Sequence, residues 1–175
     1  VPAAGLAVVD ARVTQTIDHA RVLPDYPIHA VRGGATRNIP IMTGTTTEEW
    51  KLFGAMEKAI TGLNEESMLK RLSLTLPDVD FKKLLAPYPA MLEARGEAPT
   101  PPNLFMAVQT DRIFGAPATR LLEAHTKNGG AGYAYLFDWK SPIAKGAFGA
   151  CHALELGYVF GTYNLPGAEK FSGSN

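Results

Sequence analysis

The sequence predicts an α/β fold in which two strands are separated by a long helical segment. Residues 39–43 form a short apolar run that ends at Gly44, as in a strand buried on both faces. Residues 133–139 are rich in aromatic side chains and predict a second strand. Between them, apolar residues recur mainly at helical spacing. Because two strands satisfy only part of each other's backbone groups, we expect them to belong to a larger sheet.

Length and composition narrow the class of protein. The chain has 175 residues, about one domain, with 46% hydrophobic residues, 17 basic residues and 17 acidic residues. A core is therefore expected, and neither nucleic acid nor a membrane is expected as a partner. The single cysteine, Cys151, excludes an internal disulfide and is expected to be a small buried residue. The absence of a signal peptide favours the cytoplasm, although the start at Val1 also suits a mature product or a fragment.

Helices account for most of the remaining chain. Residues 1–38 are expected to be loops with room for one short strand and one short helix. A helix is predicted over 48–60, and the spacing Thr46-x-x-Glu49 fits a capping box at its start. Thr45-x-x-Glu48 has the same spacing.

Further along, Asn64 begins a second short helix that carries Leu72. Six prolines over 77–102 leave room only for a short helix around 81–85. Residues 104–127 predict one long helix, or two that meet near Gly115.

Common motifs of catalysis are absent from the sequence. There is no metal-binding His or Cys spacing, no glycine-rich phosphate loop and no Gly-x-Ser-x-Gly turn. His19 and His29 are expected to be solvated, and His125 to lie at the edge of a core. His152 follows a loop of small residues, which is a position typical of a general base.

Two segments carry a family resemblance. Residues 149–161 read Gly-Ala-Cys-His-Ala-Leu-Glu-Leu-Gly-Tyr-Val-Phe-Gly and strongly resemble the catalytic-histidine segment of type-B carboxylesterases, the family of para-nitrobenzyl esterases and cholinesterases. Residues 39–49 read Ile-Pro-Ile-Met-Thr-Gly-Thr-Thr-Thr-Glu-Glu and resemble its catalytic-acid segment. Weaker matches, such as Asp-Arg-Ile-Phe at 111–114, follow the family's order, and the resemblance covers about residues 8–163.

The resemblance assigns roles to individual residues. Glu49 matches the family's acid, His152 its general base and Glu48 the residue before the acid. Glu155 matches a glutamate that we expect to support the histidine loop. Trp50 replaces the glycine that follows the acid in the family. Because a bulky residue cannot readily adopt a positive φ, we expect the turn to be reshaped. This substitution weakens the assignment of the acid to Glu49 instead of Glu48. The capping box would also compete for the Glu49 carboxylate.

The resemblance implies a fragment of an α/β-hydrolase fold, namely C-terminal strands of its central sheet with helical insertions. Residues 1–175 would be the C-terminal part of one catalytic domain, and the nucleophile-bearing N-terminal part would be absent. The implied reaction is hydrolysis of a carboxylic ester by a Ser-His-Glu triad. The implied partners are a small-molecule ester and the N-terminal part of the same enzyme, with no cofactor and no metal.

Two other classes of function stay open from sequence: a non-catalytic, cholinesterase-like binding or adhesion domain, and an autonomous helical interaction module. The esterase hypothesis makes two geometric predictions. The carboxylate of Glu49 should lie within hydrogen-bond reach of His152, and the two strands should be parallel neighbours joined by a helical crossover.

Overall fold

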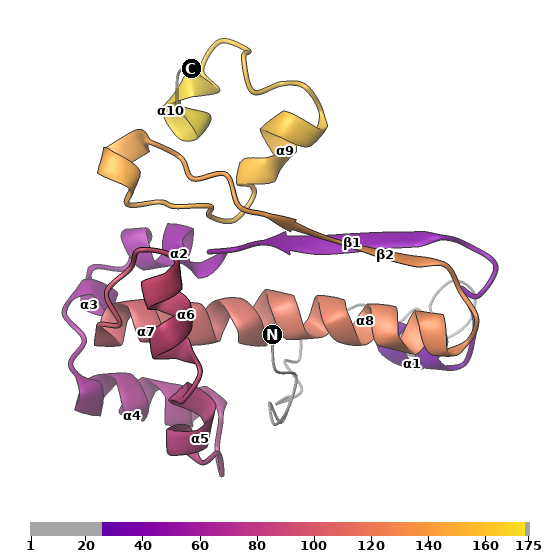
Figure 1. The fold of residues 1–175 in the computed structure, drawn as a ribbon, viewed down its shortest axis with the longest axis horizontal. Coiled ribbons are helices and arrows are strands. Elements are labelled where there is room, and N and C mark those ends of the chain that lie inside the picture. Colours follow the sequence, from indigo (N-terminus) through magenta and orange to yellow (C-terminus); the bar gives the residue numbers. More distant parts are fainter. Residues whose placement is uncertain (1–25, 174–175) are drawn as a thin grey trace.

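A computed structural model describes residues 26–173. Figure 1 shows a long helical rod lying along a narrow two-stranded ribbon, with shorter helices grouped at one end of the rod. Two small helices near the C-terminus, α9 (Leu154–Val159) and α10 (Glu169–Ser172), lie on the other side of the ribbon. His19, which we expect to be solvated, lies outside the described residues, and the short helix expected within 1–38 is present as α1 (Pro27–Arg32).

The two strands are parallel neighbours, which confirms the predicted pairing. Strand β1 (Ile41–Thr46) pairs with β2 (Gly132–Phe137) in a register that runs from Ile41 opposite Gly132 to Thr46 opposite Phe137. Strand β1 begins two residues later than the predicted 39–43. Pro40 has no N–H to donate to the ladder, and the first bond is made by Ile41 N–H to the Ala131 carbonyl at 2.9 Å.

The rod is one continuous helical segment, so the sequence alternative of two separate helices is not adopted. It consists of α7 (Pro101–Thr110), a π-helical turn (Asp111–Gly115) and α8 (Ala116–Lys127). In the π-helical turn, Ala116 N–H donates to the Asp111 carbonyl five residues back. Pro117 explains the wider turn, because proline lacks an N–H and its ring clashes with the carbonyl four residues earlier.

The helices between β1 and the rod differ from the prediction in two ways. They are α2 (Trp50–Met56), α3 (Lys58–Thr61), α4 (Glu65–Thr75), α5 (Phe81–Leu85) and α6 (Tyr88–Ala94). The single helix predicted over 48–60 is wrong, because Glu57 is extended and divides α2 from α3. The prediction that prolines leave room only for 81–85 is also wrong. Pro89 stands in the first turn of α6, where a missing N–H costs no helical bond.

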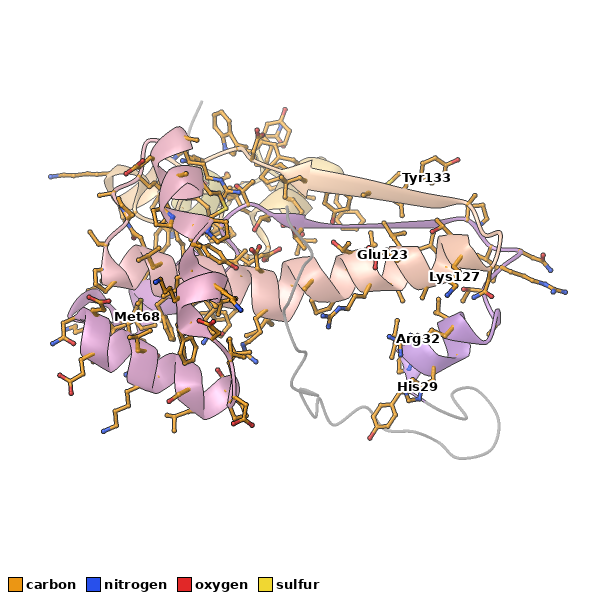
Figure 2. The ribbon with its side chains drawn as sticks, turned by 60° about the horizontal axis from the view of Figure 1, so that its bottom comes forward. His29, Arg32, Met68, Glu123, Lys127 and Tyr133 are labelled. Carbon is orange, nitrogen blue, oxygen red and sulfur yellow. The ribbon has the colours of Figure 1, made fainter. Side chains whose placement is uncertain are left out.

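The apolar core lies among these short helices and α7. It holds Leu72, Leu76 and Val108 with no exposed surface, and Met68 is 1% exposed. Helix α4 is fixed at its start by a capping box, in which Ser67 N–H donates to Asn64 Oδ1 at 2.9 Å. Figure 2 shows Met68 within this helical group, distant from the α1 end of the rod.

His125 is fully buried, so the prediction that it lies at the edge of a core is wrong. Its Nδ1 lies 3.0 Å from Thr36 Oγ1 and its Nε2 lies 3.1 Å from the Ala131 carbonyl oxygen. The ring therefore links α8 to the chain before each strand. His29, in contrast, is exposed on α1 (Pro27–Arg32), as predicted.

The outer face of the ribbon is apolar and open in the described part of the chain. Met42 is 70% exposed, Tyr133 56% and Tyr135 41%, and these three side chains lie on the same face of the ribbon. Figure 2 shows Tyr133 on the side of β2 away from the rod. No helix among residues 26–173 is long and apolar enough to cross a membrane.

Candidate active site

The predicted acid lies in the turn between β1 and α2. Glu49 is 4% exposed and has helical backbone angles directly before the first residue of α2. Its Oε1 accepts a hydrogen bond from Thr46 N–H at 2.7 Å. Because this bond holds one carboxylate oxygen against the end of β1, the direction of the other oxygen is fixed as well.

The predicted capping box is only half formed. The Glu49 side chain accepts from Thr46 N–H, but the hydroxyl of Thr46 is buried with no hydrogen-bond partner in the described part of the chain. The reason is that Thr46 ends a strand and the helix begins only at Trp50, whose N–H donates to Thr110 Oγ1 at 3.0 Å.

The predicted base lies in the loop after β2. His152 follows Cys151, and its N–H donates to the Glu49 carbonyl at 3.3 Å. The next residue, Ala153, has a left-handed φ of 66° at the start of α9. The loop therefore passes directly beside the acid turn, although 103 residues separate the two side chains in sequence.

The acid and base side chains are in contact, which confirms the predicted geometry. His152 Nδ1 lies 2.7 Å from Glu49 Oε2. The two roles expected to compete for the Glu49 carboxylate are both filled, one by each oxygen. The Glu49 side chain is 5% exposed and that of His152 is 42% exposed. Within the described residues, His152 Nε2 has no hydrogen-bond partner.

Two aromatic rings pack against the imidazole. The ring centroid of Phe53, on α2, lies 5.4 Å from that of His152, and the centroid of Phe114, in the π-helical turn, lies 5.0 Å from it. The sequence analysis placed Phe53 within the helix predicted over 48–60 and Phe114 within the helical segment 104–127, and it gave neither ring a part in the site. The helical period carries no sign that they meet a loop histidine, so this part of the site was missed.

Trp50 does not distort the acid turn in the way we expected. It is the first residue of α2 and is not among the residues with positive φ, so the turn does not require the freedom of glycine. The indole packs against Phe53 with centroids 4.8 Å apart. Glu49, and not Glu48, faces His152.

Glu48 points instead into a cluster of buried charges. Its Oε1 contacts Lys51 Nζ, which also lies 2.8 Å from Glu97 Oε2. Burial raises the pKa of Glu48, but hydrogen bonds from Glu97, Lys51 and the Ala150 N–H, with the charge of Lys51, outweigh it and bring the pKa to about 2. Burial and the neighbouring Glu48 raise the pKa of Glu97.

In the described part of the chain, Glu155 and Cys151 make no hydrogen bond to the side chains of Glu49 and His152. Glu155 Oε2 is buried without a hydrogen-bond partner in residues 26–173, so its predicted support of the loop stays a prediction. Cys151 is fully buried, as predicted, and burial raises the pKa of its thiol to about 11. The thiol therefore stays protonated at neutral pH and is a poor nucleophile. No group of three potential metal ligands occurs in the described residues.

An acid after one strand and a histidine after its parallel neighbour, joined through a helical crossover, define a chain of the α/β-hydrolase fold. The model of the carboxylesterase family matches residues 6–174, and the chain belongs to this family.

Characterised relatives are similar over most of this chain. The para-nitrobenzyl esterase of Bacillus subtilis (strain 168) is 31% identical over 154 residues, which cover 87% of the chain and 28% of that protein. A crystal structure of the Geobacillus stearothermophilus carboxylesterase EST55 at pH 6.2 matches with a TM-score of 0.69 and 31% identity, covering 89% of the chain and 31% of EST55. The structure of EST55 at pH 6.8 gives a TM-score of 0.64 and 30% identity, covering 89% of the chain and 29% of EST55. The chain thus spans less than a third of the length of these relatives.

Proposed function

We propose that this chain supplies the acid, Glu49, and the base, His152, of a Ser-His-Glu triad that hydrolyses carboxylic esters. The observation that carries the proposal is the 2.7 Å contact between His152 Nδ1 and Glu49 Oε2, with Nε2 left without a partner among the described residues. In a triad of this kind, Nδ1 faces the carboxylate and Nε2 faces the nucleophile.

The contacts suggest how each group acts. His152 Nε2 takes the proton of the serine hydroxyl as the serine oxygen attacks the ester carbonyl, and then gives that proton to the departing alcohol. Water next attacks the carbonyl of the acyl-serine while Nε2 takes a proton from it, and Nε2 returns that proton to the serine oxygen as the bond to the acyl group breaks and the carboxylic acid leaves. Glu49 accepts the Nδ1–H bond, keeps the imidazole in the tautomer that leaves Nε2 free, and stabilises the imidazolium. The Thr46 N–H holds the carboxylate in place for this role.

In this proposal the serine and the oxyanion-hole amides come from a segment that precedes residue 1 in the complete protein. The order Ser, acid, His is the order of α/β-hydrolases, and this chain provides its last two members. The chain matches 28–31% of the length of the relatives, which is the share expected of one part of a catalytic domain.

The test uses the full-length protein that contains this sequence, assayed with a short-chain nitrophenyl ester. His152→Ala should lower kcat by about 10⁴-fold or more, and Glu49→Gln by about 10³- to 10⁴-fold. His29→Ala is the matched control, because His29 lies on α1 at the other end of the rod (Figure 2) and should leave kcat unchanged.

Three results would contradict the proposal. Equal loss of activity in His29→Ala would show that the effect is not specific to His152, which contradicts its role as the base. A full-length protein that binds but never hydrolyses esters would favour the binding or adhesion hypothesis. Ester hydrolysis by the 175-residue chain alone, abolished in His152→Ala, would mean that the nucleophile lies within these residues.

A further inference from the structure

We propose that Glu48 is a positioning residue, which holds the loop Gly149–Cys151 so that His152 meets Glu49. The inference rests on the proposed function, since it concerns the same acid–base pair. It assigns to the second glutamate of the turn a task distinct from that of the first: Glu49 contacts the imidazole, and Glu48 contacts the backbone that carries it.

The first support is a pair of hydrogen bonds that joins the acid turn to the histidine loop. Glu48 N–H donates to the Ala150 carbonyl at 3.0 Å, and Ala150 N–H donates to Glu48 Oε2 at 2.7 Å. Ala150 and Cys151 are both fully buried, so this backbone has no water to replace a lost partner. Because His152 is only two residues further on, a shift of Ala150 moves the imidazole.

The second support is the tight fit of the loop against the carboxylate. Gly149 has a φ of +54°, and a Cβ at this position would lie 2.2 Å from Glu48 Oε2. With any residue other than glycine at position 149, the loop could not lie as close to the Glu48 carboxylate as it does. Such an approach is expected where the carboxylate sets the path of the backbone.

The third support is the set of charges that keeps Glu48 in place. Lys51 contacts Glu48 Oε1, and the Lys51, Glu48 and Glu97 side chains are 15%, 4% and 13% exposed. Lys140, in the segment between β2 and the histidine, lies 3.5 Å from Glu97 Oε1 and 3.9 Å from Glu48 Oε1. A buried ion pair loses stability when one partner is removed, because an uncompensated charge stays behind.

The cluster also connects the site to the helical insertion. Glu97 lies in the loop between α6 and α7, and the neighbouring Arg95 donates from Nη1 to the Thr47 carbonyl at 3.2 Å. A cavity of about 20 Å³, lined by Thr47, Glu48 and Glu97 among others, adjoins the charges and has room for about one water molecule. The Glu48 side chain is 4% exposed, so water screens its charge weakly, whereas Lys140 at 45% exposed is in contact with solvent.

The experiment is a double-mutant cycle in the full-length protein, because a positioning residue should matter only while the pair that it positions is intact. With Glu49 present, Glu48→Ala should lower kcat by about 30- to 100-fold, the size expected from a misplacement of about 1 Å, and should leave KM within about threefold. With Glu49→Gln already in place, Glu48→Ala should lower kcat by no more than about twofold. Glu57→Gln, which removes another ion-paired glutamate outside the site, should change kcat in neither background.

Hydrogen exchange provides a readout that does not depend on activity. In Glu48→Ala, the peptide covering 147–153 should exchange faster than in the wild type, while peptides from α4 should be unchanged. Glu48→Gln keeps an oxygen for the Ala150 N–H but loses the charge that Lys51 requires, and it should lower kcat by about 5- to 10-fold. If Glu48→Ala does not fold, the same cycle with Glu48→Gln decides the question.

The outcomes separate this inference from the proposed function. If His152→Ala abolishes hydrolysis but neither Glu48 variant lowers kcat, the inference is wrong and the triad stands. If Glu48→Ala lowers kcat by the same factor with and without Glu49, Glu48 acts by general stability, and the positioning role is wrong. If His152→Ala retains activity, the proposed function itself fails.

Discussion

Two buried regions of the chain are held together by different forces. One is the helical insertion, by which we mean the helices between β1 and β2 that pack around Leu72. The other is the acid–base junction, which consists of the turn of Glu48 and Glu49 and the loop that carries His152. The insertion buries side chains such as Leu72, Met68 and Val108, none of which carries a charge. The junction buries Glu48 and Glu49, which are 5% and 4% exposed and are held by polar side chains that are themselves more exposed. Burial of apolar area is non-directional, whereas each hydrogen bond or ion pair needs a defined geometry.

This difference implies that stability and site geometry can be changed separately. A cavity in the insertion should reduce stability and leave the pair intact in molecules that remain folded. Loss of the Glu48 charge should disturb both stability and site geometry, because Glu48 contacts the backbone that carries His152. The following variants test this contrast, in order of decreasing effect on stability.

The largest effect is expected for Leu72→Ala in the insertion core. Leu72 has no exposed surface, and removing a buried leucine side chain leaves a cavity that costs about 2–5 kcal/mol. Urea unfolding of the full-length protein at low micromolar concentration measures the loss, and kcat of the folded variant should stay within about twofold of the wild type. A loss of kcat as large as that of Glu48→Ala would show that the two regions are not separable.

The second effect, for Glu48→Gln, should depend on pH. The folded-state pKa of Glu48 is about 2, against an ordinary value of 4.5. A carboxylate whose pKa is lowered by folding stabilises the folded state at pH values above its ordinary pKa. This contribution to stability is lost as the pH falls from about 4.5 through about 2. Glu48→Gln should therefore cost on the order of 2 kcal/mol at pH 7 and progressively less below pH 4.5. Urea unfolding of both proteins at pH 7 and pH 3.5 measures the difference.

Glu97 provides the control, since its pKa is shifted in the opposite direction. Burial and the neighbouring Glu48 raise the pKa of Glu97. The contribution of Glu97 to the stability of the fold is therefore present at pH values below its ordinary pKa, and it is lost as the pH rises through the raised pKa. Glu97→Gln should then be less destabilising at pH 7 than Glu48→Gln. An equal cost of both variants at every pH would mean that the cluster acts by packing and not by charge.

The same contrast explains how much of the structure the sequence could predict. The two strands, the short helix that begins at Asn64 and the helices predicted over 81–85 and 104–127 follow from local periodicity and turn residues, and these predictions are largely confirmed. The pairing of Glu49 with His152 followed from the family resemblance and not from spacing, because no local pattern reports a contact across 103 residues.

What was missed depends on tertiary contacts. Glu57 adopts an extended conformation that divides α2 from α3, although the apolar period continues through it. Nothing near His125 in sequence indicates that Thr36 and Ala131 would enclose it. The aromatic contacts of Phe53 and Phe114 with His152 require the long helix and the loop to be placed first. Tertiary packing therefore determines the conformation and surroundings of each of these residues, and the local sequence does not report them.

A smaller effect is expected for Asn64→Ala, which removes the cap of α4. Asn64 Oδ1 accepts from Ser67 N–H at 2.9 Å, and the Asn64 N–H donates to Ser67 Oγ at 3.0 Å. Loss of such a cap costs about 1 kcal/mol. The measurement is again urea unfolding, with Asn64→Asp as a control that keeps the acceptor and should retain most of the stability. A similar loss in Asn64→Asp would show that the cap itself is not what stabilises α4.

The smallest effect is expected for Glu57→Gln, which breaks an ion pair that the solvent reaches. Arg71 Nη1 lies 2.6 Å from Glu57 Oε1, about as close as any pair in the junction, but the two side chains are 34% and 50% exposed. Water screens both charges, so the loss of stability should be below about 0.5 kcal/mol and should shrink further in high salt. Glu48→Gln removes one carboxylate charge in the same way, yet its side chain is 4% exposed and its partner Lys51 is 15% exposed. If urea unfolding at pH 7 gave the same loss for both variants, burial would not be what makes the charges of the junction matter. The contrast between the two regions would then have to rest on the Ala150 hydrogen bond alone.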